Sequence, residues 1–174
     1  MDESRAWLQQ ALSDRSAAER FDDADSTQRC HAIAKYQQTV EKAVKAIVVA
    51  LREVGVRTTS IGYTHPIECF VSVLVHLPHG AGHRDIASHL SRLLDESTRA
   101  SIYSLEELIP RRPPPGQPHR KNTEYPFQDA RNQWTFPAAQ GVFSSSDIQR
   151  FRRLSHDIAE GASRIIATIR RAPR

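Results

Sequence analysis

Mostly apolar residues recur at alternating steps of four and three between positions 33 and 54, a spacing that predicts one long amphipathic helix. The positions on this face are Ile33, Gln37, Val40, Val44, Ile47, Leu51 and Val54. Gly55 follows directly and indicates the end of the helix, because glycine readily adopts the left-handed conformation of a helix C-terminus. The polar segment 22–27 precedes the helix, and Ser26 or Thr27 is expected as its N-cap.

Three more regions show helical periodicity. An N-terminal helix is predicted after the acidic start at residues 2–4, with its apolar stripe at Trp7, Leu8, Ala11 and Leu12. Region 84–109 carries two apolar faces, with a kink expected near Ser97: the first is Ile86, Leu90, Leu93 and Leu94, and the second is Ile102, Leu105, Leu108 and Ile109. The last helix is expected to be capped at residues 144–146, and its apolar face is Ile148, Phe151, Leu154, Ile158, Ala162, Ile165 and Ile169.

The remaining segments are less regular. Residues 64–77 contain valines that alternate as in a strand, but Pro66 after Thr64 favours a helix start, and no partner strand is evident. Residues 110–122 contain five prolines and are expected to form an extended loop. Residues 132–143 are expected to be irregular. The chain is therefore predicted to be one all-α domain, an antiparallel bundle of about five helices with an irregular, proline-rich connection (110–143) before the last.

Composition is that of a soluble globular protein, with 39% hydrophobic and 25% charged residues. No apolar run is long enough to span a membrane, and the two cysteines form no disulfide framework, so a cytoplasmic location is expected. The net charge of +4 is unevenly distributed, because residues 110–174 carry twelve basic against five acidic side chains. The C-terminal part is therefore the candidate surface for a polyanion.

The stretch "HRDIASH" (83–89) contains a candidate catalytic set. His89 is a candidate general base or acid, because its ordinary pKa is near neutrality. Arg84, one and a half helical turns away, is a candidate for gripping phosphate oxygens. Asp85 is interpreted either as orienting Arg84 or as a helix cap. The alternative is that all three are solvated surface residues.

Other polar groups admit similar alternatives. Arg150 and His156 repeat the Arg-to-His spacing without a polar residue after the arginine. Lys42 and Lys45 belong either to a solvated helix face or to a phosphate site. His76, His79, His83 and His89 form a loose cluster, but no cysteine or carboxylate completes a metal set, so neither a metal nor another cofactor is expected.

The basic connection and the last helix supply candidate nucleic-acid contacts. Their members are Arg111, Arg112, Arg120, Lys121, Tyr125, Arg150 and Arg153. The cations are expected to follow a nucleic-acid backbone, and Tyr125 to stack on a base. The alternative interpretation is a solvated, proline-rich loop and an ordinary polar helix face.

The ordered set of segments resembles the HEPN domain family. "AIAKYQQTVEKAVKAIVVAL" (32–51) is similar to the family's second helix, with Gln38, Glu41, Lys42, Ala43, Lys45 and Ala46 at the aligned positions. "THPIE" (64–68) stands where the family often has a His-Asp-Leu helix start. "NTEYPF" (122–127) is similar to its Arg-Tyr-Pro loop, and residues 143–166 are similar to its closing helix.

The resemblance implies an all-helical bundle that forms a homodimer and acts on RNA. Catalytic members of the family are metal-independent endoribonucleases of bacterial toxin–antitoxin or defence systems. Their Arg-to-His motifs meet across a dimer interface, and Arg84, Asp85 and His89 match that motif. The chain has Glu124 in place of the loop arginine and Pro66 in place of the helix-start aspartate. These departures favour the alternative of a non-catalytic module that binds a nucleotide, a nucleic acid, or an antitoxin or effector protein.

Overall fold

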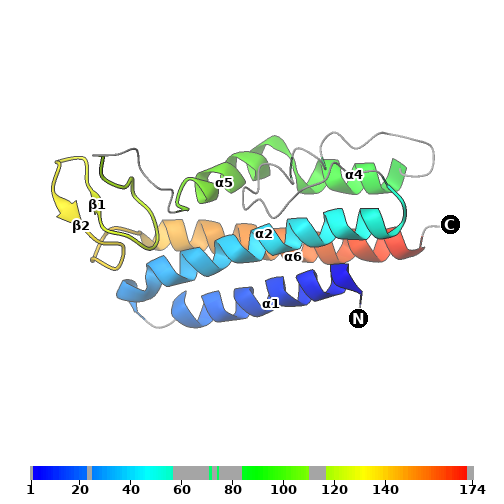
Figure 1. Ribbon diagram of the computed structural model, residues 1–174, viewed down its shortest axis with the longest axis horizontal. Coiled ribbons are helices and arrows are strands. Elements are labelled where there is room, and N and C mark those ends of the chain that lie inside the picture. Colours follow the sequence, from blue (N-terminus) through cyan, green and yellow to red (C-terminus); the bar gives the residue numbers. More distant parts are fainter. Residues whose placement is uncertain are drawn as a thin grey trace.

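The computed structural model describes residues 2–22, 25–56, 71, 74, 84–109 and 117–171, and these are mostly helical (Figure 1). The helices are α1 (Glu3–Asp22), the short 3-10 helix η1 (Ser26–Gln28), α2 (Arg29–Glu53), α4 (Arg84–Leu93), α5 (Glu96–Glu106) and α6 (Ser145–Arg171). Two short strands, β1 (Phe127–Gln128) and β2 (Trp134–Thr135), pair with each other. The helix predicted for 64–77 lies outside the described residues, apart from the buried side chains of Val71 and Leu74.

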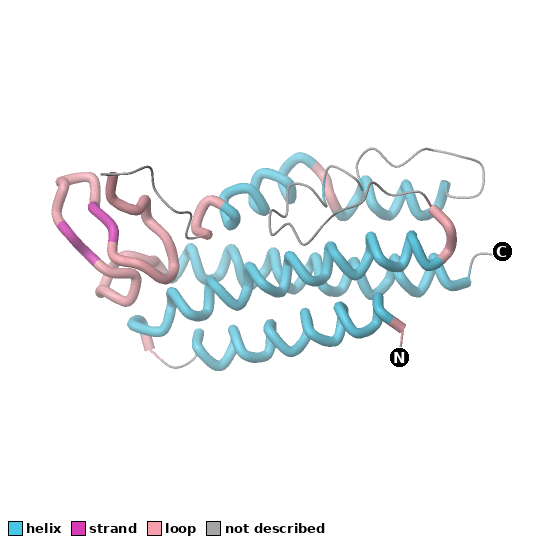
Figure 2. Tube along the Cα trace, viewed as in Figure 1, coloured by secondary structure: helices cyan, strands magenta, loops and turns pink. Residues whose placement is uncertain are grey.

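The helices lie along one long axis, with α2 and α6 parallel to each other and α1 antiparallel to both. Helices α4 and α5 lie end to end over α2 and α6, on the side away from α1. The start of α1 and the end of α6 are at one end of the bundle, and the β1–β2 hairpin is at the other (Figure 2). The hairpin end therefore adjoins the start of α6.

Helix α2 is the centre of the core. Six of the seven predicted face positions are buried, and Val54 at the helix end is exposed. Residues outside that stripe are also buried: Ala32, Tyr36, Thr39, Ala43, Ala46, Val48 and Ala50. A helix with apolar residues on most of its circumference needs neighbours on several sides. In this fold α1, α5 and α6 all pack against α2.

One carboxylate of α1 pairs with two lysines on the polar side of α2. Asp14 is only 4% exposed, and its carboxylate accepts hydrogen bonds from Lys42 and from Lys35 Nζ, the latter at 3.1 Å. Lys35 also donates to Gln38 Oε1 at 2.8 Å. Burial acts to raise the pKa of Asp14, but the two lysine hydrogen bonds outweigh it and hold that pKa below its ordinary value. The aspartate therefore stays charged and fixes α1 against α2.

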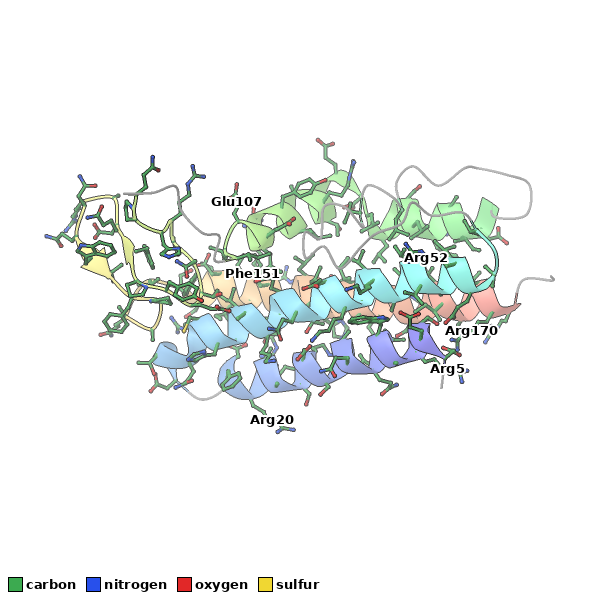
Figure 3. The ribbon with its side chains drawn as sticks, in the orientation of Figure 1. Arg5, Arg20, Arg52, Glu107, Phe151 and Arg170 are labelled. Carbon is green, nitrogen blue, oxygen red and sulfur yellow. The ribbon has the colours of Figure 1, made fainter. Side chains whose placement is uncertain are left out.

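Further polar contacts fix α1 to the other long helices. Ser4 is fully buried, and both its backbone N–H and its hydroxyl donate to Glu53 at the end of α2. Arg170 of α6 donates to the same hydroxyl and to Asp2, and Figure 3 shows it beside the start of α1. At the far end of α1, Tyr36 and Arg152 both reach Asp22, at 3.2 and 3.3 Å.

Two expectations about helix boundaries were wrong. The cap before α2 is Asp25, whose side chain accepts from Thr27 N at 2.6 Å, and it begins η1 rather than α2 itself. Between α4 and α5 the chain breaks fully at residues 94–95 instead of kinking near Ser97. Asp95 N-caps α5 by accepting from Thr98 N at 2.7 Å. In both places a short aspartate carboxylate satisfies an amide that has no partner within the helix.

Two other boundary predictions are confirmed. Gly55 has φ of +84°, the left-handed conformation that ends a helix without steric cost. Ser144 and Asp147 cap α6 reciprocally: Ser144 N donates to the Asp147 carboxylate at 2.9 Å, and Asp147 N donates to Ser144 Oγ at 3.1 Å.

The hairpin corrects the expectation that residues 132–143 are irregular, but only at Trp134 and Thr135, which form a strand; the rest of that range has neither helix nor strand. Phe127 pairs with Thr135 and Gln128 pairs with Trp134 in antiparallel register. Asp129 closes the turn, because its side chain accepts from Gln133 N at 2.9 Å and from Arg131 N at 2.8 Å. These backbone hydrogen bonds lower the pKa of Asp129. The strands have only two residues each, too few for alternation in the sequence to reveal.

We predict that Asp14→Asn lowers the free energy of unfolding by about 2–3 kcal/mol, because it leaves Lys35 and Lys42 without their charged partner in a largely buried position. Urea denaturation followed by circular dichroism measures the change. Glu124→Gln, which removes one exposed carboxylate, is the matched control and is expected to change stability by less than about 0.5 kcal/mol. Equal stabilities for the two variants would contradict this role of Asp14.

Candidate anion-binding cleft

The predicted catalytic residues lie on α4, which begins at Arg84. Asp85 is exposed and His89 is half-buried, while the side chain of Arg84 lies outside the described part of the structure. In a regular helix, positions 85 and 89 are about 40° apart around the axis and positions 84 and 89 about 140° apart. Asp85 and His89 therefore share one side of α4, whereas Arg84, the first residue of the helix, is positioned on a different side.

The second Arg-to-His pair does not share a surface. Arg150 and His156 are six residues apart on α6, which places them about 120° apart around the helix. His156 is exposed, and its Nδ1 lies 3.5 Å from the carboxylate of Asp157. Arg150 instead faces α5 across a cleft that His156 does not line.

The basic connection is only partly described. Arg111 and Arg112 lie outside the described residues, whereas Arg120 and Lys121 are exposed. Tyr125 is 48% exposed, and its ring stacks on the ring of His119 with centroids 5.1 Å apart.

Asn122 holds the turn of this connection in place. It is 2% exposed, its amide donates to the backbone oxygens of Arg120 and Tyr125, and its oxygen accepts from the backbone N–H groups of Glu124 and Tyr125. Thr123 N donates to Leu108 O, which joins the turn to the end of α5. The exposed cations and Tyr125 are therefore presented by an ordered turn.

The lysines of α2 are committed to contacts within the bundle. Lys42 donates to Asp14, and the ammonium of Lys45 lies 4.2 Å from the ring centroid of Trp7. A contact of this kind places the cation over the electron-rich face of the indole. These contacts favour a structural role for the two residues over the phosphate-site interpretation.

A cleft of about 420 Å³ lies between the first half of α5 and the first half of α6. One wall is the hydroxyl side of α5, and the other is a polar stripe of α6 with Leu154 between them. The α5 residues are Ser97, Thr98 and Ser101, and the polar α6 residues are Ser146, Gln149, Arg150, Arg153 and Asp157. The cleft thus brings together Arg150 and Arg153, two of the predicted nucleic-acid contacts.

The spacing of residues along α6 explains why one wall is polar. Positions 146, 150, 153 and 157 follow steps of four, three and four, so they line one side of the helix. The apolar positions 148, 151, 154 and 158 follow a neighbouring stripe and are buried. The same helix therefore contributes to the core with one face and displays arginines with another.

The position of the other wall depends on Gly161 and Asp95. A Cβ atom at Gly161 would lie 2.3 Å from Leu93 Cδ1, so glycine lets the end of α4 approach α6 closely. The chain then breaks, and the Asp95 cap starts α5 over the preceding turns of α6. The hydrogen bond from Thr98 N lowers the pKa of Asp95, which keeps this cap charged.

The chemistry of the cleft suits an anion that also carries hydroxyl groups. Among the residues that the structure describes, neither Arg150 nor Arg153 has a carboxylate within ion-pair distance. A guanidinium binds phosphate through two parallel N–H groups, and serine and threonine hydroxyls add single donors. Asp157 is acceptor-only when ionised, so it supplies a partner for a ligand hydroxyl.

The α5 wall was missed from the sequence. Ser97, Thr98 and Ser101 are ordinary polar residues of a helix, and nothing in their spacing points to a ligand. They become relevant because they face the α6 arginines, which are about fifty residues away along the chain. The sequence signal that existed was the capping pattern of Asp95 and Thr98, which marks the start of a new helix.

Comparisons with known proteins give no match for this chain, and its described residues contain neither a metal-site cluster nor a helix that could span a membrane. No protein-family model, no curated protein and no solved structure matches this chain. Across the described residues, no three or more histidine, cysteine, aspartate or glutamate side chains gather as a metal site would require. His76, His79 and His83 of the predicted histidine cluster lie outside those residues. None of the described helices has the length and apolar character needed to cross a bilayer.

We predict that inorganic pyrophosphate raises the thermal unfolding midpoint in a concentration-dependent manner, because an anion that binds only the folded cleft stabilises it by mass action. The combined change Arg150→Ala and Arg153→Ala should abolish most of the increase. Arg164→Ala with Arg171→Ala removes the same charge from exposed positions later in α6 and should preserve it. Equal increases in the two double variants, measured by differential scanning fluorimetry, would contradict the assignment of the cleft.

Proposed function

We propose that this protein binds RNA through the cleft between α5 and α6. The observation that carries the proposal is the position of Arg150 and Arg153 opposite a wall of hydroxyl groups. The cleft extends from Ser146 to Asp157, about 16 Å along the helix axis, which exceeds the length of a single phosphate. Phosphate contacts of this kind give affinity without sequence preference.

Asp157 favours RNA over a bare anion. Its carboxylate lies on the same wall as the two arginines and is 65% exposed at the side chain. A carboxylate repels a phosphate but accepts a hydrogen bond from a ribose 2′-hydroxyl, the group that distinguishes RNA from DNA. In the proposed complex the arginines bind phosphate and Asp157 binds the ribose.

The proposal includes a HEPN-like bundle that acts as a homodimer in the cytoplasm, within a defence or toxin–antitoxin system. Its support is the ordered set of similar segments and the mostly helical fold. An antitoxin or effector protein would be the regulatory partner. Glu124 is exposed on the loop that is similar to the family's Arg-Tyr-Pro loop. This position therefore carries a negative charge where the family has the positive charge of arginine.

The direct experiment is RNA binding at fixed salt. We predict that a fluorescent single-stranded oligoribonucleotide binds the wild-type protein, and that Arg150→Ala with Arg153→Ala weakens it at least tenfold, since each charged hydrogen bond contributes about 1.5–3 kcal/mol. Arg164→Ala with Arg171→Ala should change the affinity less than threefold. Fluorescence anisotropy measures both, and equal losses in the two variants would overturn the assignment of RNA to this cleft.

A second candidate function is metal-independent RNA cleavage at α4. The observation that favours it is the shared, solvent-reaching flank of Asp85 and His89 in a helix that begins at Arg84. In this candidate function His89 takes the proton of a ribose 2′-hydroxyl while the 2′-oxygen attacks the adjacent phosphorus, and Arg84 stabilises the charge that develops on the phosphate. The bond from phosphorus to the 5′-oxygen breaks, the protonated imidazole returns a proton to that oxygen, and a 2′,3′-cyclic phosphate remains. A second copy of the chain would complete the site, as the resemblance implies.

Cleavage is tested separately from binding. If α4 is catalytic, mixed RNA is degraded in excess chelator, and Arg84→Ala or His89→Ala lowers the rate at least a hundredfold while the affinity for RNA is retained. Gel electrophoresis of the RNA measures the rate. Unchanged cleavage in both variants excludes α4 as the catalytic site. If the wild-type protein does not degrade RNA at all, the protein is a non-catalytic RNA-binding module.

A further inference from the structure

The β1–β2 hairpin and the residue that follows it expose two large aromatic side chains. Trp134 is 67% exposed and Phe136 is 57% exposed, the two largest values for big hydrophobic residues in the described part of the chain. The register explains their direction: Phe127 and Thr135 pair on the inner face, and Phe127 is buried. Trp134 lies on the opposite, outer face. Phe136 comes directly after β2 and is exposed next to it in the chain.

Contacts within the hairpin fix its conformation, so Trp134 and Phe136 are exposed in an ordered segment. The Asp129 side chain closes the turn through two backbone hydrogen bonds, and Phe127 and Phe143 are buried on either side of the aromatic residues in sequence. Exposed aromatic surface of this size costs solvation free energy that burial would recover. A ligand that stacks on the rings would recover it.

The cations in the same segment as the rings favour a nucleic acid as that ligand. Arg120, Lys121 and Arg131 are exposed within the same segment, 117–136. Of its two carboxylates, Asp129 is occupied by the turn, which leaves Glu124 as the exposed one. Flat aromatic rings among cations are the features by which proteins hold single strands, with bases on the rings and phosphates on the cations.

The hairpin also leads directly into the cleft. Phe136 is followed by a short connection that ends at the Ser144–Asp147 cap of α6, and Ser146 of that first turn already lines the cleft. Figure 2 shows the strands beside the start of α6. A strand whose phosphates lie along Arg150 and Arg153 would therefore reach the hairpin at its other end.

We propose that Trp134 and Phe136 form a stacking platform for the bases of single-stranded RNA, as an extension of the α5–α6 cleft. The platform rests on the proposed RNA-binding function, because the cleft supplies the phosphate contacts that hold the strand. Trp134 and Phe136 bind bases regardless of sequence, since each base offers a flat face. Tyr125, stacked on His119, lies outside the platform and has its own partner.

The experiment separates stacking from charge by comparing two ligands, an oligouridylate and an inorganic polyphosphate of matched charge. Trp134→Ala and Phe136→Ala should each weaken oligouridylate binding about tenfold and leave polyphosphate binding within twofold, because only the RNA has bases. Tyr103→Ala, which removes a 41% exposed aromatic ring from α5, is the control and should change neither. In a Trp7→Phe background, Trp134 is the sole tryptophan, and its fluorescence should be quenched by oligouridylate but not by polyphosphate.

The outcomes distinguish the platform from the cleft. Unchanged oligouridylate affinity in both hairpin variants, with loss in the Arg150/Arg153 variant, overturns the platform and retains the cleft; the aromatic face would then suit a protein partner. Equal weakening of both ligands by Trp134→Ala also overturns the platform, since stacking would not distinguish them. If wild-type protein binds polyphosphate but not oligouridylate, the RNA-binding function fails, and the platform fails with it.

Discussion

The buried carboxylate of Asp14 is the interaction on which the bundle depends. Helix α2 is apolar on most of its circumference, so it must be covered on several sides. Lys35 and Lys42 also lie on it, and α1 can cover that side only if their charges are compensated. Asp14 accepts a hydrogen bond from each lysine and so offsets part of their charge. With α1 placed on one side of α2, the opposite side is left for α5, and α6 packs against both α1 and α2.

The cleft follows from this arrangement. Because α6 packs against α2 with one face, the polar stripe that contains Arg150 and Arg153 is turned away from the core. Gly161 allows α4 to approach α6, and the Asp95 cap then begins α5 opposite the arginines. The hairpin extends the same end of the bundle with exposed aromatic rings. Core packing and ligand chemistry thus depend on different faces of the same helices.

Periodicity predicted much of the helical fold. The apolar faces of α2 and α6 are buried almost as expected, and Gly55 and the Ser144–Asp147 pair mark real helix ends. The all-round burial of α2 was not predictable from one stripe, because most of the other buried positions are alanine or threonine, which are neutral in such patterns, and Tyr36 and Val48 lie too far apart to form a stripe of their own. The cleft joins α5 hydroxyls to α6 arginines about fifty residues apart, so Arg150 and Arg153 could be proposed but their partners could not. The hairpin strands are too short to leave a pattern in the sequence.

The salt dependence of RNA affinity tests the proposed RNA-binding function most directly, because it counts the phosphate contacts that the cleft would make. For single strands, the slope of log affinity against log salt concentration changes by about 0.7 for each neutralised phosphate. Replacing both Arg150 and Arg153 with alanine should therefore make the slope shallower by about 1.4, while replacing Arg164 and Arg171 should leave it unchanged. The same slope for the Arg150/Arg153 variant and the wild type would contradict the account.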